Sequence, residues 1–329
     1  MLKWVSVLVL ILLAVLVVIS TAKGESQDKP EKGRLVLRKL NGFYEQLQQQ
    51  LQQELLSKQE LKSLRKAEKL KQKQQKDKTD DKGRVYVLSF AGDVQASQVA
   101  MLEKEVSAIL SFAKPGDEVL LRLESGGGVV HGYGLAASQL QRLRDAGLKL
   151  TVCVDKVAAS GGYMMAAVGQ QICAAPFAIV GSIGVMAQIP NVHRFLKKHD
   201  VDVELHTAGK YKRTLTSLGE NTDEGREKFR QDLERIHQLF KLHISKFRRQ
   251  LDIDAVSDGD IWLGTEAIDK KLVDRIITSE QLLQELSASK QLIAVQWQIK
   301  KSLSQRFQFG LRQQLFGLWD ELRLRHPWQ

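Results

Sequence analysis

The sequence predicts an α/β fold with a mostly parallel sheet. Between residues 83 and 186, short runs rich in valine, leucine and isoleucine alternate with segments whose apolar residues recur at helical spacing. Strands that alternate with helices in this way are typical of βαβ units. Glycine-rich stretches follow two of the runs, at 125–128 and 160–162. Such loops at the carboxyl ends of parallel strands are where functional sites are built.

The individual elements follow from these patterns. Apolar runs predict strands, amphipathic segments predict helices, and Pro115 and Gly116 predict a turn between them. Strands are expected at 85–90, 118–123, 148–154 and 171–174, a glycine-punctuated turn and strand at 179–186, and helices at 97–113, 133–146, from about 190 and at 223–251, with a further turn and helix within 258–274.

Composition and charge restrict the class of protein. The chain has 329 residues, 43% of them hydrophobic, and a net charge of +11. This length suits one large or two modest domains. Many basic residues lie between Lys23 and Lys82, in a tract without interleaved aromatic residues or a nucleic-acid-binding module. The tract therefore indicates a solvated or membrane-apposed segment, and no nucleic acid partner is expected.

Cysteine usage indicates buried thiols. Cys153 and Cys173 each lie in an apolar run, where small core residues are expected. A disulfide between them would need an oxidising compartment, and their spacing alone does not establish one. No Cys/His cluster has metal-ligand spacing, so no metal or other cofactor is expected.

The amino terminus predicts a membrane anchor. Residues 5–19 are almost wholly apolar, and with their neighbours they approach the roughly 20 residues that span a bilayer. We expect an uncleaved transmembrane anchor at 1–22, with a cleaved signal peptide as the alternative. The basic residues that follow this segment would keep the body of the protein in the cytoplasm under the positive-inside rule.

Three further parts are expected after the anchor. Residues 23–82 are rich in Gln and Lys and predict a charged helical stalk. Residues 83–280 predict the globular domain. In the C-terminal extension, 281–329, leucines recur at helical spacing among arginines. That pattern predicts an amphipathic helix that lies on a membrane surface or packs against the body or a partner.

Ser160 is the candidate nucleophile. It lies in Val-Ala-Ala-Ser-Gly-Gly-Tyr, where an apolar strand gives way to a helix. Free amide groups at a helix N-terminus suit an attack that creates an oxyanion. The same motif also describes a serine N-cap beside two turn glycines. Likewise, the three glycines at 126–128 are compatible with an oxyanion hole or with a tight turn.

A serine nucleophile needs a base, and the sequence offers two kinds. His193 follows a predicted strand, although its surroundings resemble the start of an ordinary amphipathic helix. His131, after the glycine loop, could contact a substrate or cap a turn. Lys210 and Lys212 are the lysine candidates. A lysine serves as a base only when desolvated, because its ordinary pKa of about 10.4 keeps it charged at neutral pH.

Three ordered motifs carry a resemblance to a known family. They are Ser-Gly-Gly-Gly-Val at 125–129, the stretch around Ser160 followed by Val-Gly-Ser-Ile-Gly-Val at 180–185, and Gly-Lys-Tyr-Lys-Arg at 209–213. Between about residues 83 and 277, the chain resembles the signal peptide peptidase A family of serine peptidases, and most closely its membrane-anchored, SohB-like branch. The anchor and stalk also suit that branch.

The resemblance implies a fold similar to ClpP and the crotonases, with a Ser/Lys dyad. Carried onto this chain, Ser160 is the nucleophile, Lys212 is the general base and Ser182 holds the lysine amine in place. The amide of Gly161 would form the oxyanion hole together with a second amide from the glycine loop. That loop often reads Asn-Ser-Pro-Gly-Gly in the family, but this chain has no proline there, so Gly126 and Gly127 both remain candidates.

The implied function is a membrane-anchored endopeptidase that needs no cofactor. Its substrates would be hydrophobic peptides, such as released signal peptides, or damaged membrane and exported proteins. Single-copy relatives form rings, which implies a homo-oligomer such as an octamer with shared active sites. The resemblance places the domain on the periplasmic side of a bacterial inner membrane, against the flanking charges. A crotonase-like acyl-thioester enzyme and a non-catalytic membrane scaffold are the alternatives.

Overall fold

A single sheet of ten strands organises the part of the chain that the structure describes, residues 33–75 and 83–299 of a computed structural model. Seven of the strands run in the order β1-β10-β2-β3-β4-β6-β9, while β5, β7 and β8 continue from β3 as a side branch. Neighbours from β10 through β9 are parallel, and β8 is antiparallel to β7. The predicted α/β fold with a mostly parallel sheet is therefore confirmed.

The elements have the following bounds. The strands are β1 (Gly33–Lys39), β2 (Arg84–Gly92), β3 (Glu118–Ser125), β4 (Lys149–Val154), β5 (Val157–Ala159), β6 (Gln171–Ala174), β7 (Ile179–Gly181), β8 (Ile261–Leu263), β9 (Arg275–Ile276) and β10 (Gln291–Ile299). The helices are α2 (Asn41–Leu55), α3 (Lys58–Gln75), α4 (Val99–Phe112), α5 (Val130–Asp145), α6 (Gly161–Ala166), α7 (His193–Lys198), α8 (Asp223–Phe247), α9 (Gly264–Ala267) and α10 (Ser279–Ser287).

Both faces of the sheet are buried around β2, as expected for parallel strands. Tyr86, Leu88 and Phe90 point to one apolar core, while Val85 and Val87 point to another. This alternation follows from the two-residue period of a strand. The near-continuous apolar run of β2 therefore provides side chains for a helical layer on each side.

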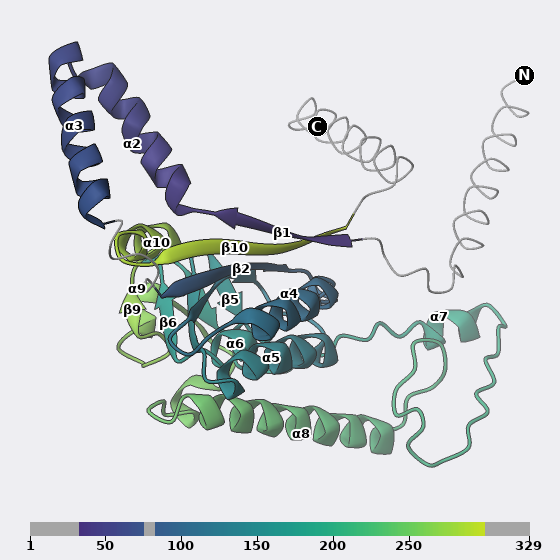
Figure 1. Ribbon diagram of the computed structural model, residues 1–329. Coiled ribbons are helices and arrows are strands. Elements are labelled where there is room, and N and C mark those ends of the chain that lie inside the picture. The colour runs from purple at the N-terminus through teal and green to yellow at the C-terminus, as the bar shows by residue number, and fades with distance from the viewer. Residues whose placement is uncertain (1–32, 76–82, 300–329) are drawn as a thin grey trace, which may run out of the picture. The chain divides into compact units, whose positions relative to one another are not determined.

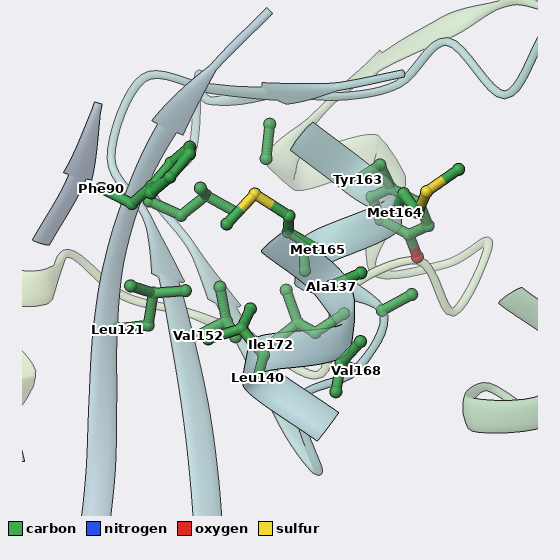
Figure 2. Close-up of a cluster of buried hydrophobic side chains, with 14 of the residues drawn as sticks. Phe90, Leu121, Ala137, Leu140, Val152, Tyr163, Met164, Met165, Val168 and Ile172 are labelled. Atoms are coloured by element: carbon green, nitrogen blue, oxygen red, sulfur yellow. The ribbon is translucent and has the colours of Figure 1, made fainter. Parts of the chain in front are cut away.

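Helices α4, α5 and α6 cover one face of the sheet, and α8 lies beyond them (Figure 1). Their buried side chains form the larger core with the inward side chains of the strands. Figure 2 shows part of this core, where α6 contributes Tyr163 and Met165, α5 contributes Ala137 and Leu140, and the strands contribute Phe90, Leu121, Val152 and Ile172. The helix that begins directly after Ser160 is thus held on its buried sides.

The second face carries α10 and the start of α2. Leu282 and Leu283 of α10 pack with both cysteines, and Leu40 and Tyr44 lie against the same cluster. The side chain of Asn41 donates to the backbone carbonyls of Ser287 and Lys290, at 3.0 and 2.9 Å. The beginning of α2 is therefore fixed to this face.

The structure corrects two predictions about the ends of the body. Residues 33–39 form strand β1 within the range expected to be a helical stalk, and 291–299 form strand β10 within the expected C-terminal extension. Between residues 41 and 75 the expected stalk consists of two helices, since α2 ends at Leu55 and Ser57 starts α3 through reciprocal hydrogen bonds with Glu60. The predicted domain limits at 83 and 280 stay predictions.

Most other elements agree with the sequence. The long helix α8 forms as predicted, with the Thr222 hydroxyl capping its start by accepting from the Gly225 amide at 3.1 Å. Two predicted helices are short, since α7 has 6 residues and α9 has 4. Strand β8 directly precedes α9, and Lys271 after it has φ 60°, a left-handed conformation that does not continue a helix.

Cys153 and Cys173 are paired in register on β4 and β6, and both are buried free thiols. Their mutual interaction raises the pKa of Cys153 and lowers that of Cys173. Among the described residues, no helix has the length and apolar character to cross a membrane. The anchor expected at 1–22 and most of the expected amphipathic segment, 300–329, lie outside the described residues.

Candidate functional site

Ser160 lies between β5 and α6, at the strand-to-helix junction that the sequence predicts. Its backbone has φ 52° and ψ −118°, an unusual conformation for a residue with a side chain. Two backbone hydrogen bonds hold it there, from the Ser160 amide to the Gly181 carbonyl at 2.8 Å and from the Met164 amide to the Ser160 carbonyl at 3.0 Å. Strained backbone of this kind is concentrated at functional sites.

The two glycines after Ser160 are required by close packing. A Cβ at Gly161 would lie 2.4 Å from the ring of Tyr133, and one at Gly162 would lie 2.5 Å from the carbonyl oxygen of Ser125. Neither position tolerates a side chain, because real Cβ contacts are not this short. The start of α6 is consequently pressed against α5 and the end of β3.

The glycine loop at 126–128 lies directly beside the candidate nucleophile. Gly127 has φ +88°, and a Cβ there would lie 2.7 Å from the amide nitrogen of Gly161 and 2.8 Å from the Cβ of Ser160. Gly126, in contrast, has open space at the corresponding position. The structure therefore brings two separate sequence motifs together, and Gly127 is the loop glycine next to Ser160.

These residues line one cavity of about 650 Å³. Its wall combines the two glycine-bearing loops with apolar side chains from α5, α6 and α8. The lining residues are Val94, Gly126, Gly127, Gly128, Val129, Val130, Tyr133, Ser160, Gly161, Met164, Ser182, Gly184, Val185, Met186, Ile236, Phe240, Asp258 and Gly259. An apolar cavity with a few convergent polar groups is typical of a ligand or active site.

Ser182 enters the same cavity from the loop after β7. It also has a positive φ, 52°, and its amide donates to the Asp260 carbonyl at 2.6 Å. The carbonyl of the neighbouring Gly181 accepts the hydrogen bond from the Ser160 amide. A main-chain hydrogen bond therefore joins the loops that carry the two serines. Five of the six predicted site residues, all except Lys212, therefore line one cavity.

A buried hydrogen-bond chain runs behind the glycine loop. The Gly127 amide donates to the Ser125 hydroxyl at 3.1 Å, and that hydroxyl lies 2.5 Å from the hydroxyl of Tyr133. The Tyr133 hydroxyl in turn donates to the Asp93 carbonyl at 2.8 Å. Because a hydroxyl has a single proton, this last bond makes Ser125 the donor to Tyr133. No local sequence pattern indicates Tyr133 or Asp93 as part of the site, because their contacts join segments that are distant in sequence.

Lys212 is not among the residues that line this cavity within one chain. It is exposed in the segment between β7 and α8, which extends beyond the layers of sheet and helices (Figure 1). Its amide donates to the Gly209 carbonyl at 3.1 Å, but its ammonium group contacts no hydrogen-bonding or ionic partner in the described part of the chain. Its neighbour Lys210 instead forms an ion pair with Glu224 at 2.7 Å.

Neither histidine candidate lines the cavity beside Ser160. His193 begins the short helix α7, and His131 is exposed near the start of α5. His243 of α8 contacts the helix that follows Ser160. Its Nε2 lies 3.0 Å from the carbonyl oxygen of Met164 in α6. Burial lowers the pKa of His243, so its neutral ring serves as a packing and hydrogen-bonding group against α6.

A buried ion pair between Arg248 and Asp274 lies next to the residues that contact α6. Arg248 is 1% exposed and makes two hydrogen bonds to Asp274, at 2.7 and 2.8 Å, and one to the Lys271 carbonyl at 2.8 Å. The Tyr163 hydroxyl donates to the neighbouring Leu272 carbonyl at 2.7 Å. This arrangement connects the end of α8 to the helix that follows Ser160. No group of three or more His, Cys, Asp or Glu side chains within 33–75 and 83–299 is placed to hold a metal ion.

Comparison with known proteins identifies the family. The protein-family model described as "Peptidase family S49 N-terminal" matches residues 1–140, and the family model "Peptidase family S49" matches residues 142–293. The chain is 50% identical over 318 residues to a probable protease SohB of Haemophilus influenzae, covering 93% of this chain and 89% of the relative. It is also 50% identical over 286 residues to a probable protease SohB of Buchnera aphidicola, covering 83% of this chain and 93% of the relative.

A solved structure aligns more loosely. It is a membrane-bound stomatin-specific protease in complex with a substrate peptide, with a TM-score of 0.40 and 14% identity over 62% of this chain and 80% of that one. An alignment at that level supports no statement about the site. The two SohB relatives cover most of the chain at 50% identity, and both are described as probable proteases, which supports a peptidase. On that evidence, the chain belongs to peptidase family S49, as a homologue of the SohB proteases.

Proposed function

We propose that the protein is a serine endopeptidase in which Ser160 is the nucleophile and Lys212 is the general base. The observation that carries this proposal is the placement of Ser160. It is held in a strained conformation at the start of α6, beside Gly127 and at the wall of a largely apolar cavity. The expected ClpP/crotonase-like architecture provides the same arrangement of a nucleophile beside glycine amides.

The exposed position of Lys212 supports a shared active site. We propose a homo-oligomeric ring, such as an octamer, in which this lysine enters the cavity of a neighbouring copy. The segment that carries it is rich in exposed large apolar side chains, which favours burial against another subunit. They are Met186, Ile189, Val192, Phe195, Val201, Val203, Leu205, Tyr211 and Leu218.

The chemistry then follows from the cavity. The apolar wall excludes water and favours the neutral amine that a general base needs. The amine takes the Ser160 proton, the resulting alkoxide attacks a peptide carbonyl, and the amide of Gly161 and an amide of the glycine loop stabilise the tetrahedral anion. The anion collapses and its C–N bond breaks, and the departing amine takes the proton from the lysine ammonium. Water, deprotonated by the same lysine, then hydrolyses the acyl-enzyme, which releases the carboxylic acid product and restores the Ser160 hydroxyl. Ser182, on the same wall, would hold the lysine amine by a hydrogen bond.

The apolar wall also favours hydrophobic, extended substrates, which we propose are released signal peptides or damaged membrane and exported proteins. We propose a single-pass protein of a bacterial inner membrane, anchored by residues 1–22, with its catalytic domain in the periplasm. Alkaline phosphatase fused to the C-terminus would be active in that orientation. An inactive fusion, expressed at a normal level, would place the domain in the cytoplasm.

Labelling by a fluorophosphonate probe tests the dyad. We expect the detergent-purified full chain to label, and the Ser160→Ala and Lys212→Ala variants to lose labelling by several orders of magnitude. Lys210→Ala is the matched control, since Lys210 is an exposed neighbour paired with Glu224. Loss with Ser160→Ala alone would exclude Lys212 as the base. An unlabelled wild type would favour a thioester enzyme or a scaffold.

Mixing the two inactive variants tests the shared site. If the serine and lysine come from different copies, dissociating and reassembling Ser160→Ala with Lys212→Ala chains restores up to about a quarter of the sites in a random mixture, by simple probability of the two intact partners meeting. Each variant reassembled alone is the control. Mixed assemblies without any labelling would contradict a site shared between copies.

A further inference from the structure

The Gly127 amide, next to the candidate nucleophile, is engaged by a side chain of its own loop. Its hydrogen is directed at the Ser125 hydroxyl, at a donor–acceptor distance of 3.1 Å. Ser125 is 2% exposed, so the hydrogen points toward a buried oxygen. The Gly127 backbone itself lines the cavity and lies against Ser160 and Gly161. An amide directed at a buried hydroxyl cannot at the same time be directed fully at a substrate oxygen.

The Ser125 hydroxyl is held in this position by a directed chain. It donates its proton to Tyr133, whose own proton goes to the Asp93 carbonyl at 2.8 Å. The lone pairs of Ser125 are then available to the Gly127 amide, and each hydroxyl of the chain uses its single proton once. Because both hydroxyls are buried, the satisfied chain is a stable arrangement of the loop in the absence of a bound substrate.

The backbone at this point is able to change direction. Reorientation of the peptide unit between residues 126 and 127 requires rotation about ψ of one residue and φ of the next. Both residues are glycine, so the rotation meets little steric resistance. A Cβ at Gly126 would meet no atom within 4 Å, which shows open space on that side of the loop.

We propose that Ser125 is a positioning residue that holds the Gly127 amide away from the oxyanion position, and that this peptide unit rotates when Ser160 reacts. The inference rests on the proposed function, because it needs Ser160 to form an anionic adduct. A developing oxyanion is a stronger acceptor than a neutral hydroxyl, so it displaces Ser125 late in the reaction. The reaction therefore breaks one hydrogen bond of the resting loop before the adduct gains its full stabilisation.

The Ser125→Ala variant tests this role. Without the hydroxyl, the Gly127 amide is free in the resting state, and the second-order rate of fluorophosphonate labelling is expected to rise about three- to tenfold, the effect of one hydrogen bond. Hydrogen–deuterium exchange should become faster at the 125–129 backbone. Ser138→Ala is the matched control, since Ser138 is an exposed serine of α5 whose hydroxyl donates to the Gly134 carbonyl. It should change neither quantity.

The outcomes separate this inference from the proposed function. If the wild type labels at Ser160 and Ser125→Ala labels at the same rate or more slowly, then Ser125 does not hold the Gly127 amide away from the oxyanion. Ser160 would remain the nucleophile. A wild type that does not label would overturn both. If Ser125→Ala does not fold, Tyr133→Phe carries the test, because it keeps the ring against Gly161 but removes the acceptor that orients Ser125. Faster labelling and faster exchange are expected for Tyr133→Phe too, and their absence would contradict the positioning role of Ser125.

Discussion

The Ser160 amide donates a hydrogen bond to the Gly181 carbonyl at 2.8 Å, which joins the loop of the candidate nucleophile to the loop of Ser182. The bond continues the parallel pairing of β5 with β7, in which Ala159 is opposite Gly181. The two serines that line the cavity are therefore positioned by one continuous piece of sheet. Their separation is set by the backbone, so a change at Gly181 should affect the nucleophile directly.

Gly181→Ala should disrupt this junction. Gly181 has φ +102°, and a Cβ would lie 2.6 Å from the Trp262 ring and 3.0 Å from the Asp260 carbonyl oxygen. We expect a loss of about 1–3 kcal/mol in the free energy of unfolding and at least about tenfold slower fluorophosphonate labelling. Gly116→Ala, at φ +92° with open space around it, is the control for the backbone cost alone. Equal losses of labelling in both variants would refute a specific role for this junction.

The register of the glycine loop can be resolved by a second pair of variants. Gly127→Ala places a methyl group 2.7 Å from the Gly161 nitrogen and 2.8 Å from the Cβ of Ser160, whereas Gly126→Ala meets no atom within 4 Å. Gly127→Ala should therefore abolish labelling and lower the melting temperature by several degrees, with a much smaller effect of Gly126→Ala. The reverse order of effects, measured by labelling and thermal unfolding, would mean that Gly126 lies against the nucleophile.

The core of the fold could be predicted from sequence because its signals are local. The apolar runs of β2, β3 and β4 and the helical spacing in α4 and α5 are each visible within one segment. Strands β1 and β10 cannot be recognised from local sequence patterns, and the reason is physical. Strand β1 lies in a charged tract. Strand β10 is stabilised by pairing with β2, in which Gln291 is opposite Arg84, a residue that is distant in sequence.

The candidate site could be predicted only in part. Ser160 and the glycines at 126–128 are predictable because their motifs follow strands whose carboxyl ends a parallel sheet brings together. The assignment of Ser182 comes from the family resemblance alone. The hydrogen-bond chain behind Gly127 joins Asp93, Ser125 and Tyr133 across three segments, and such contacts have no periodic signal. Nor does the sequence determine where an exposed segment places Lys212, because tertiary contacts and neighbouring copies decide it.

Arg248, which follows α8, should be needed for the stability of the folded protein. Arg248→Ala removes both hydrogen bonds to Asp274 and the bond to the Lys271 carbonyl, and it leaves the carboxylate without its buried partner. We expect a loss of about 3 kcal/mol in the free energy of unfolding, less than for a fully buried pair because Asp274 is 28% exposed. Arg249→Ala, at the exposed neighbouring position, should change stability by less than about 0.5 kcal/mol. Similar urea midpoints for the two variants would contradict this role.

Glu105 should make the stability of the protein depend on pH. It lies on α4 with 5% of its surface exposed, and its carboxylate accepts a hydrogen bond from the Trp297 amide of β10 at 2.7 Å. Burial raises the pKa of Glu105 from 4.5 to about 7, although the Trp297 bond opposes the shift. The folded chain thus holds a proton that the unfolded chain releases near pH 4.5.

Since the folded-state pKa is raised, the favourable contribution is complete below pH 4.5 and is lost as pH rises to 7. The total loss is about 3 kcal/mol at 1.36 kcal/mol for each pKa unit. Glu105→Gln keeps an oxygen acceptor for the Trp297 amide but cannot ionise. We expect its urea midpoint to exceed that of the wild type at pH 8 and to approach it at pH 4. Glu103→Gln, an exposed position on the same helix, should show no such dependence. A constant difference between Glu105→Gln and the wild type at both pH values would mean that Glu105 does not titrate in this range in the folded protein.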